Sequence, residues 1–402
     1  MRASGVDTDF RKGVRKVKEV RVGIIGLGNM GTSHAKNITK GEVPHMRLAA
    51  ICDIAPARRE YAGENFPEAK IFESAQDMYD SGLIDAVIIA VPHYDHPPLA
   101  IAAFEKGLHV MSEKPAGVYT KQVLEMNAAA ERSGKVFGIM YNQRTNPVYQ
   151  KIRQLVQSGQ LGTIKRVAWM ITDWYRPQCY HDSCTWRSTW KTEGGGTLIN
   201  QNPHQLDLWQ WMFGMPSKIM SHVSFGKYYD IEVEDDVTAF MQYDNGMTGL
   251  YVTSTGEAPG INHLEISCDM GMLVVQDNKI NFKRNVESER EFNAKNMEIF
   301  GRPEWWNCEI PADSSGGPQH IGILRNFTRA ILEGTPLLAP GYEGINGLTI
   351  SNAIHYSAWT NGWADVQNFP HDDFYRILQE KIRDSKVVKK EQQRTASTEN
   401  TY

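Results

Sequence analysis

The chain has 402 residues, more than one hydrophobic core usually holds, so we expect two domains. It is 41% hydrophobic and 22% charged with a formal net charge of -4, which provides no basic surface for nucleic acid. No apolar run approaches the ~20 residues that cross a bilayer, so no membrane partner is expected.

The two ends and the cysteines bear on where the protein works. Residues 1–19 are polar and basic without an apolar segment, which favours a flexible arm over a secretory signal, and residues 386–402 read as a polar tail. The five cysteines are scattered and odd in number, which indicates a reducing, cytoplasmic location. The run Cys179–Cys184 gathers metal-compatible side chains. We expect no metal site there, because no second cluster has ligand spacing.

A glycine-rich turn follows the apolar run Val20–Ile25. Its sequence is Gly26-Leu27-Gly28-Asn29-Met30-Gly31, a G-x-G-x-x-G pattern between a strand and a helix. Such a turn lets backbone approach a pyrophosphate, and the N–H groups and dipole of the following helix attract the anion. The turn therefore predicts a dinucleotide site.

A second strand, ending at Asp53, supports this interpretation. Its carboxylate lies about 25 residues after the turn, the spacing of an acid that binds the adenosine ribose. A carboxylate repels a 2′-phosphate, so NAD is expected rather than NADP. Arg58 and Arg59 follow closely and weaken that preference, and we include Arg58 among the cofactor-binding residues.

Short apolar runs alternate with amphipathic segments from residue 20 to residue 143. The pattern predicts a parallel, doubly wound Rossmann sheet. The predicted strands are Val20–Gly26, Met46–Asp53, Asp85–Val91, Leu108–Ser112 and Val136–Tyr141. The predicted helices are Met30–Thr39, Ala55–Asn65, Pro98–Lys106 and Thr120–Ser133.

Glu113-Lys114-Pro115 stands at the carboxyl end of one of these strands, where ligands of open parallel sheets bind. A desolvated lysine beside a cationic nicotinamide has its pKa lowered towards neutrality, and it can then take a proton from a substrate hydroxyl. Glu113 could hold Lys114 or the cofactor. The bond before Pro115 is a candidate for the cis form. The alternative is an ordinary surface salt bridge.

The pattern changes in residues 144–385, for which we expect an α+β domain with a large, open, mostly antiparallel sheet. The predicted strands are Ile164–Thr172, Ile219–Phe225, Val237–Tyr243, Gly246–Ser254, His263–Cys268 and Met272–Gln276, with a hairpin turn at Asp244-Asn245-Gly246. The predicted helices are Pro147–Ser158, Thr197–Phe213, Pro318–Glu333 and Gly344–Ala358. An uncovered sheet face suggests a homo-dimer or homo-tetramer.

A triple glycine opens the predicted helix Thr197–Phe213 and allows a close backbone approach to a ligand. Asn200 and His204 are four residues apart and would share one helix face, while Asp207 could orient the imidazole. A histidine paired with an amide suits a polyol hydroxyl. The alternative for His204 is a satisfied core histidine.

Aromatic and polar side chains gather just before the triple glycine, a combination suited to sugar recognition. The ends of the Rossmann strands should also border the site. The predicted substrate-binding residues are Asn200, Tyr141, Arg144, Asp173, Tyr175, Arg187 and Trp190. For the aromatics, the alternative is packing at the domain interface.

The glycine turn, the E-K-P motif and the G-G-G…H-x-x-D motif occur here in the order typical of the Gfo/Idh/MocA family, which the chain resembles from about Val20 to Ala364. The resemblance implies NAD(P)-linked oxidation or reduction of sugars or polyols by dimers or tetramers. It makes Lys114 and His204 the catalytic pair. By position, it also adds cofactor-lining residues: Pro92, His93, His96 and Asn142.

One departure from that family concerns the residues before His204. Its usual acid four positions earlier is here Asn200, and its usual glycine two positions earlier is Asn202. An amide cannot serve in a scheme that needs an acid partner, but it can hydrogen-bond a sugar hydroxyl.

These features predict a cytoplasmic NAD-dependent dehydrogenase that oxidises a secondary hydroxyl of a sugar, glycoside or cyclitol. One alternative is a redox-neutral glycosidase or sugar-modifying enzyme with tightly bound NAD. The other is a dinucleotide-sensing regulator without chemistry, against which Lys114 and His204 argue.

Overall fold

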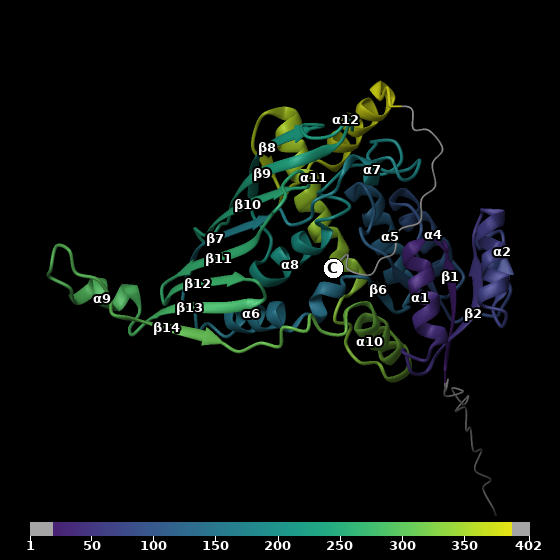
Figure 1. Ribbon diagram of the computed structural model, residues 1–402, viewed down its shortest axis with the longest axis horizontal. Coiled ribbons are helices and arrows are strands. Elements are labelled where there is room, and N and C mark those ends of the chain that lie inside the picture. The colour runs from purple at the N-terminus through teal and green to yellow at the C-terminus, as the bar shows by residue number, and fades with distance from the viewer. Residues whose placement is uncertain (1–18, 388–402) are drawn as a thin grey trace, which may run out of the picture.

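The computed structural model describes residues 19–387, so the expected N-terminal arm and polar tail lie almost entirely outside the described residues (Figure 1). Two β-sheets lie side by side, with helices between and around them (Figure 1). This is the combination of a parallel sheet and an open second sheet that the sequence predicts.

The first sheet has six parallel strands in the order β3-β2-β1-β4-β5-β6, which confirms the Rossmann topology. Its strands are β1 Val20–Ile25, β2 Met46–Cys52, β3 Lys70–Phe72, β4 Ala86–Ile89, β5 His109–Ser112 and β6 Phe137–Ile139. Its helices are α1 Asn29–Thr39, α2 Pro56–Asn65, α3 Ala75–Asp80, α4 His96–Glu105 and α5 Thr120–Ser133, with the 3-10 turns η1 His93–Asp95 and η2 Asn142–Thr145. The sequence does not predict β3, because its three residues are too few to show an apolar pattern.

The second sheet has nine strands in the order β14-β13-β12-β11-β7-β10-β9-β8-β15, and only the β7–β10 pair is parallel. Its strands are β7 Ile164–Ile171, β8 Lys218–Phe225, β9 Glu234–Gln242, β10 Thr248–Ser254, β11 Asn262–Cys268, β12 Gly271–Gln276, β13 Lys279–Asn285, β14 Trp305–Ile310 and β15 Ala364–Asp365. The predicted hairpin is confirmed, since β9 and β10 pair antiparallel across a turn where Gly246 has a φ of 86°.

The second half also contributes the helices α6 Pro147–Gln157, α7 Gln178–His181, α8 Pro203–Phe213, α9 Glu289–Lys295, α10 Gln319–Glu333, α11 Gly344–Thr360 and α12 His371–Asp384, with the 3-10 turn η3 Gly341–Glu343. Most of them pack on one face of this sheet or reach the first sheet, whereas α9 has no buried residue and lies at the far end of the sheet (Figure 1). The predicted helix Thr197–Phe213 is corrected: α8 begins at Pro203 and turns occupy 197–202. The physical reason is Pro203, which favours the first helical position and disfavours helix in the residue before it.

The two faces of the second sheet differ. Alternate residues such as Trp169, Tyr251 and Met241 are fully buried on the helix side. On the other side, Met220 pairs with Phe240 and Phe240 pairs with Leu250 across three neighbouring strands, and each is more than a third exposed. This face of the sheet is therefore open and partly apolar, as predicted.

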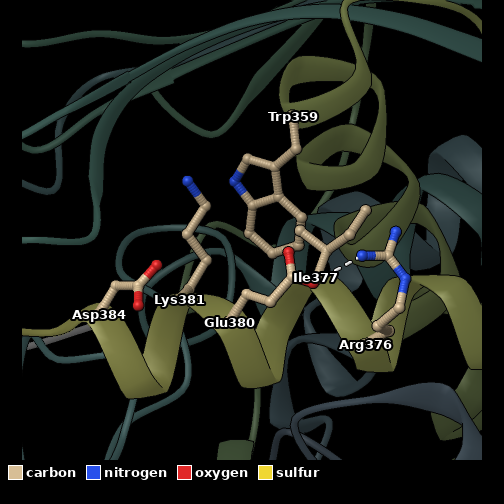
Figure 2. Close-up of a pocket in the computed structure, with 6 residues that line it drawn as sticks. All are labelled: Trp359, Arg376, Ile377, Glu380, Lys381 and Asp384. Carbon is tan, nitrogen blue, oxygen red and sulfur yellow. Dashed lines mark hydrogen bonds and ion pairs between the residues drawn. The ribbon is translucent and has the colours of Figure 1, made fainter.

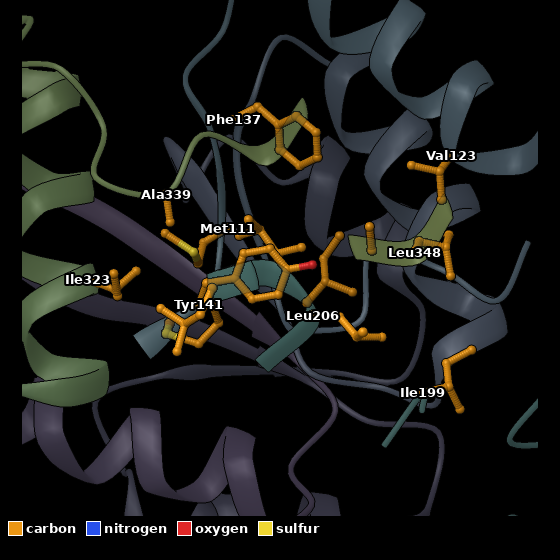
Figure 3. Close-up of a cluster of buried hydrophobic side chains, with 14 of the residues drawn as sticks. Met111, Val123, Phe137, Tyr141, Ile199, Leu206, Ile323, Ala339 and Leu348 are labelled. Carbon is orange, nitrogen blue, oxygen red and sulfur yellow. The ribbon is translucent and has the colours of Figure 1, made fainter. Parts of the chain in front are cut away.

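A continuous hydrophobic core joins the two sheets. In Figure 3, Met111 and Phe137 from the first sheet lie in one cluster with Leu206 of α8 and Leu348 of α11. Helix α11 contacts α5 of the first half as well as α8 and β8 of the second half. The edge where β5 ends is consequently held against the segment that precedes α8.

Candidate active site

The glycine turn after β1 has the geometry of a pyrophosphate cradle. Gly26 has a φ of 84°, and a Cβ at this position would lie 2.4 Å from the main-chain oxygen of Ala90. A Cβ on Gly31 would lie 1.9 Å from the oxygen of Gly26, so side chains are excluded at both glycines. A Cβ on Gly28 would meet nothing within 4 Å, so open space lies above this part of the turn.

Helix α1 presents its N-terminus at that open space. It begins at Asn29 after Gly28, and no side chain caps it. Asp53 stands next to the turn, since its carboxylate accepts hydrogen bonds from Leu27 N at 2.7 Å and Ala55 N at 2.9 Å. An uncapped helix start and a carboxylate at the end of β2 fit the pyrophosphate and ribose of a dinucleotide.

Lys114 lies immediately beyond β5 and reaches towards the second half of the molecule. Its Nζ donates a 2.8 Å hydrogen bond to the main-chain oxygen of Asn200. Burial lowers the pKa of Lys114 to about 8, although Glu113 opposes that shift. About a tenth of the amine is therefore neutral at pH 7 and about half at pH 8, a range in which it can act as a general base. The Lys114–Pro115 bond is cis, as predicted.

Glu113 is held by a histidine that the sequence analysis did not select. His34 Nε2 on α1 lies 2.7 Å from Glu113 Oε1, and both side chains are buried. Burial alone would raise the pKa of Glu113, but the hydrogen bond from His34 lowers it to about 2. A permanently charged carboxylate thus stands beside Lys114, tied to the helix that carries the glycine turn.

His204 lies in the first turn of α8 and is 2% exposed. Burial is the main cause that lowers its pKa well below the usual value, and the charge of Lys114 adds to the effect. The imidazole is therefore neutral and close enough to Lys114 to feel its charge. Tyr141 lies beside it, with ring centroids 6.4 Å apart. The predicted pair of Lys114 and His204 thus meets at one place in the structure.

The expected orientation of His204 by Asp207 is corrected. Both Asp207 oxygens accept hydrogen bonds from Arg144, at 2.6 and 2.8 Å, and both side chains are 1% exposed. Arg144 also contacts Glu343 at 2.6 Å. This corrects the expectation that Arg144 binds substrate, because two carboxylates already occupy its guanidinium. Asp207 of the H-x-x-D motif instead forms a buried ion pair with Arg144, which connects α8 to η2.

The triple glycine serves packing rather than ligand approach, which is a further correction. A Cβ on Gly194 would lie 2.3 Å from a methyl of Val118, and one on Gly196 would lie 2.1 Å from the oxygen of Glu234. The Glu234 carboxylate accepts hydrogen bonds from Gly196 N at 2.8 Å and Leu198 N at 2.9 Å. These contacts fix the turn that carries Asn200.

Glu193, directly before the triple glycine, is a site residue that the sequence analysis missed. Its side-chain carboxyl accepts hydrogen bonds from Ser188 N, at 2.5 Å, and from the amide of Asn200. Arg187 Nη1 lies 3.8 Å from Glu193 Oε1. Burial raises the pKa of Glu193 to about 7. These three partners lie within seven residues of Glu193, but irregular turns bring them together, and such turns leave no regular pattern in the sequence.

The stretch before Glu193 forms a cation–aromatic cluster. The guanidinium of Arg187 lies 4.4 Å from the Tyr180 ring centre and 4.5 Å from that of Trp186, and Arg176 lies 5.3 Å from Tyr180. The Tyr180 hydroxyl accepts hydrogen bonds from Arg187 at 2.6 Å and from Gln201 at 3.0 Å. Three of the predicted substrate-binding residues lie in this stretch. The charge of Arg187 lowers the pKa of Lys114, and the side chains of Asp173 and Tyr175 are exposed.

Four of the predicted contact residues also have structural partners, and their contacts with substrate or cofactor stay predictions. Tyr141 is 1% exposed inside the core that joins the sheets (Figure 3), and Trp190 packs against His355 and Trp359. Both ring nitrogens of His96 lie within 2.8 Å of main-chain oxygens, where they brace α4. Asn142 is fully buried and donates a 2.6 Å hydrogen bond to Gln319. His93 stays near the site, with Nδ1 3.0 Å from the oxygen of Glu193.

A surface pocket of about 280 Å³ lies elsewhere, on α11 and α12 (Figure 2). Its floor is Trp359, and Arg376 and Glu380 on its rim pair with each other at 2.7 Å. None of the predicted site residues lines it.

Within residues 19–387, no His, Cys, Asp and Glu side chains group as metal ligands. None of the helices in the described part of the chain has the length and apolar character to cross a bilayer.

The Rossmann sheet and the pyrophosphate cradle are those of an oxidoreductase that binds a nicotinamide dinucleotide. The model described as the oxidoreductase family with an NAD-binding Rossmann fold matches residues 20–141, and that of the GFO/IDH/MocA C-terminal domain matches residues 149–274. The chain therefore belongs to the Gfo/Idh/MocA family, as the sequence motifs predict. Relatives within this family are named as inositol 2-dehydrogenases and as a levoglucosan dehydrogenase.

Individual relatives are distant. The chain is 25% identical to the scyllo-inositol 2-dehydrogenase (NADP(+)) IolW of Bacillus subtilis over 86% of this chain and 96% of that protein. It is 29% identical to the rhizopine catabolism protein MocA of Rhizobium meliloti, but that match covers 48% of this chain and only 57% of MocA. The WlbA dehydrogenase of Bordetella pertussis, solved with NADH and UDP-GlcNAcA, superimposes with a TM-score of 0.72 and 24% identity over 86% of this chain and 98% of that chain.

Proposed function

We propose that this protein is an NAD-dependent dehydrogenase that oxidises a secondary hydroxyl of a sugar, glycoside or cyclitol. The observation that carries the proposal is Lys114, a half-buried amine with a pKa of about 8, placed at the end of β5 beside neutral His204. A relative named for a cyclitol, and one solved with a nucleotide sugar, support this substrate class.

In the proposed reaction, neutral Lys114 accepts the proton of the substrate hydroxyl at Nζ. When bound, the nicotinamide ring supplies the acceptor for the hydride of the same carbon. His204 hydrogen-bonds the reacting or the neighbouring hydroxyl, and its neutral form can both donate and accept. The proposed substrate contacts are the exposed side chains of Asp173 and Tyr175 and the half-buried ones of Arg187 and Asn200.

The proposed cofactor contacts are those around the glycine turn. Gly26, Gly28 and Gly31 shape the turn, Asn29 and Met30 begin α1, and Asp53 binds the ribose. We propose further cofactor contacts from Pro92 and His93, which follow β4, from Glu113, which follows β5, and from the half-buried Arg58 on α2. We propose NAD over NADP on the charge of Asp53, although IolW is named for NADP.

We further propose a cytoplasmic homo-oligomer, a dimer or tetramer, in which a second copy covers the open sheet face. The row of Met220, Phe240 and Leu250 supports this, because an apolar patch on an open sheet is stabilised by a partner surface. The five cysteines are unpaired, in keeping with a reducing compartment.

The experiment is a panel of hexoses, inositols and glycosides incubated with NAD or NADP, followed by the absorbance of the reduced nicotinamide. We expect stoichiometric reduction of NAD with members of one sugar or cyclitol class. Release of the aglycone from a glycoside without accumulation of NADH would contradict a dehydrogenase and support the redox-neutral alternative.

A further inference from the structure

We propose that Glu193 is a positioning residue for Lys114, which it controls through Asn200. This inference rests on the proposed function only where it concerns turnover. The carboxyl of Glu193 accepts a hydrogen bond from the side-chain amide of Asn200. The main-chain oxygen of the same Asn200 accepts the 2.8 Å hydrogen bond from Lys114 Nζ. One residue thus links the carboxyl to the amine.

Glu193 is itself held from several directions. Ser188 N donates to its second carboxyl oxygen at 2.5 Å, and its main-chain oxygen lies 3.0 Å from His93 Nδ1. Ser188 has a φ of 60°, a conformation that costs energy for a residue with a side chain. His181 Nδ1 lies 2.7 Å from the Ser188 hydroxyl and helps to hold it. Backbone strain next to a buried carboxyl is typical of a functional site.

Glu193 is one of the charged groups that shift the pKa of Lys114. The two carboxylates that favour the ammonium form are Glu113 and Glu193, whereas the guanidinium groups disfavour it. The charged or titratable groups that face Lys114 are Glu113, Glu193, Arg176, Arg187, His93, His204 and His320. The carboxylate of Glu113 is already hydrogen-bonded to His34. Glu193, which also faces Arg187 and Glu234, is therefore the carboxyl that links the charge of Lys114 to the position of Asn200.

The test measures the ionisation of Lys114 without any substrate. The unliganded full chain is labelled with acetic anhydride over a pH series, and modification at Lys114 is quantified by mass spectrometry. Only the neutral amine reacts. Glu193→Gln removes a negative charge that favours the ammonium form, so we expect the labelling midpoint to fall by about one pH unit. An unchanged midpoint overturns the proposal.

Glu232→Gln is the matched control. The Glu232 carboxylate accepts a 2.8 Å hydrogen bond from Trp190 N and so braces the same segment, but it is not among the groups that shift the pKa of Lys114. We expect its labelling midpoint to equal that of the wild type. A midpoint that falls equally in both variants overturns the proposal, because it would reflect loosening of the segment.

A second variant, Glu193→Asp, keeps the charge but withdraws the carboxyl from Asn200 by one methylene. We expect the wild-type labelling midpoint together with a turnover number reduced about tenfold. Wild-type turnover in this variant overturns the positioning role, even if Glu193→Gln does not fold. The labelling result does not depend on the substrate panel, so failure of the dehydrogenase proposal and failure of this inference are distinguishable.

Discussion

Lys114 Nζ donates a 2.8 Å hydrogen bond to the main-chain oxygen of Asn200, and this contact crosses from the Rossmann sheet to the segment that precedes α8. The position of the proposed base is consequently set by the packing between the two halves of the molecule. The core in Figure 3, which includes residues of both halves, supplies that packing. A rigid interface is what proton transfer over hydrogen-bond distance requires.

The pH dependence of kcat/KM for alcohol oxidation is predicted to follow Lys114. Its pKa is about 8, lowered by burial, and the protonated amine cannot accept a proton. The rate should therefore fall about tenfold for each pH unit below the pKa and level off above it. Initial rates measured from about pH 6 to about pH 10 test this, and a flat profile over that range contradicts it.

Replacement of Asp53 by Asn is predicted to weaken the preference for NAD over NADP by about tenfold, because the charge that repels a 2′-phosphate is lost. The comparison is the ratio of kcat/KM for the two cofactors. Asp80→Asn, a change of an exposed carboxylate in the same half, serves as control. A cofactor ratio that stays at the wild-type value in Asp53→Asn would remove Asp53 from cofactor selection.

The brace between Arg144 and Asp207 is predicted to stabilise the fold rather than bind substrate. Arg144→Met leaves the buried Asp207 carboxylate uncompensated, and we expect unfolding free energy to drop by about 3–5 kcal/mol. Lys121→Met, which breaks the exposed pair with Asp372, should leave stability unchanged. Chemical denaturation of both variants measures the difference, and equal stabilities would show that the brace is dispensable.

The exposed face of the second sheet is predicted to be the interface between copies of the chain. Phe240→Glu places a charge in the centre of the row formed with Met220 and Leu250, and it should dissociate the oligomer. Leu124→Glu on α5, which is also exposed but outside this face, should not. Size-exclusion chromatography with light scattering over a concentration series gives the masses. A wild-type protein that is monomeric throughout the series contradicts the proposed interface.

Local patterns predicted much of the first half of the molecule. The apolar runs before Gly26 and Glu113 became β1 and β5 because a buried parallel strand needs continuous apolar sequence. The glycine turn and the E-K-P motif then follow from where those strands end. These features depend on neighbours in sequence, which is why they can be recognised without a structure.

The second half shows what such patterns miss. The spacing of His204 and Asp207 suits an orienting hydrogen bond, but Arg144, 63 residues earlier, provides a stronger partner for the carboxylate. Glu193 contacts Ser188 and Asn200 across irregular turns, and Glu234, 38 residues after Gly196, holds that segment by accepting a hydrogen bond from Gly196 N. Long-range pairs of this kind leave no periodicity in the sequence.

The central claim, that Lys114 is the base of a dehydrogenase, is tested most directly by Lys114→Ala. Steady-state turnover with the best substrate of the panel is compared with NAD affinity measured by calorimetry. We predict that turnover falls at least about a hundredfold while the Kd for NAD stays within about threefold of the wild type. Full turnover in this variant would contradict the account.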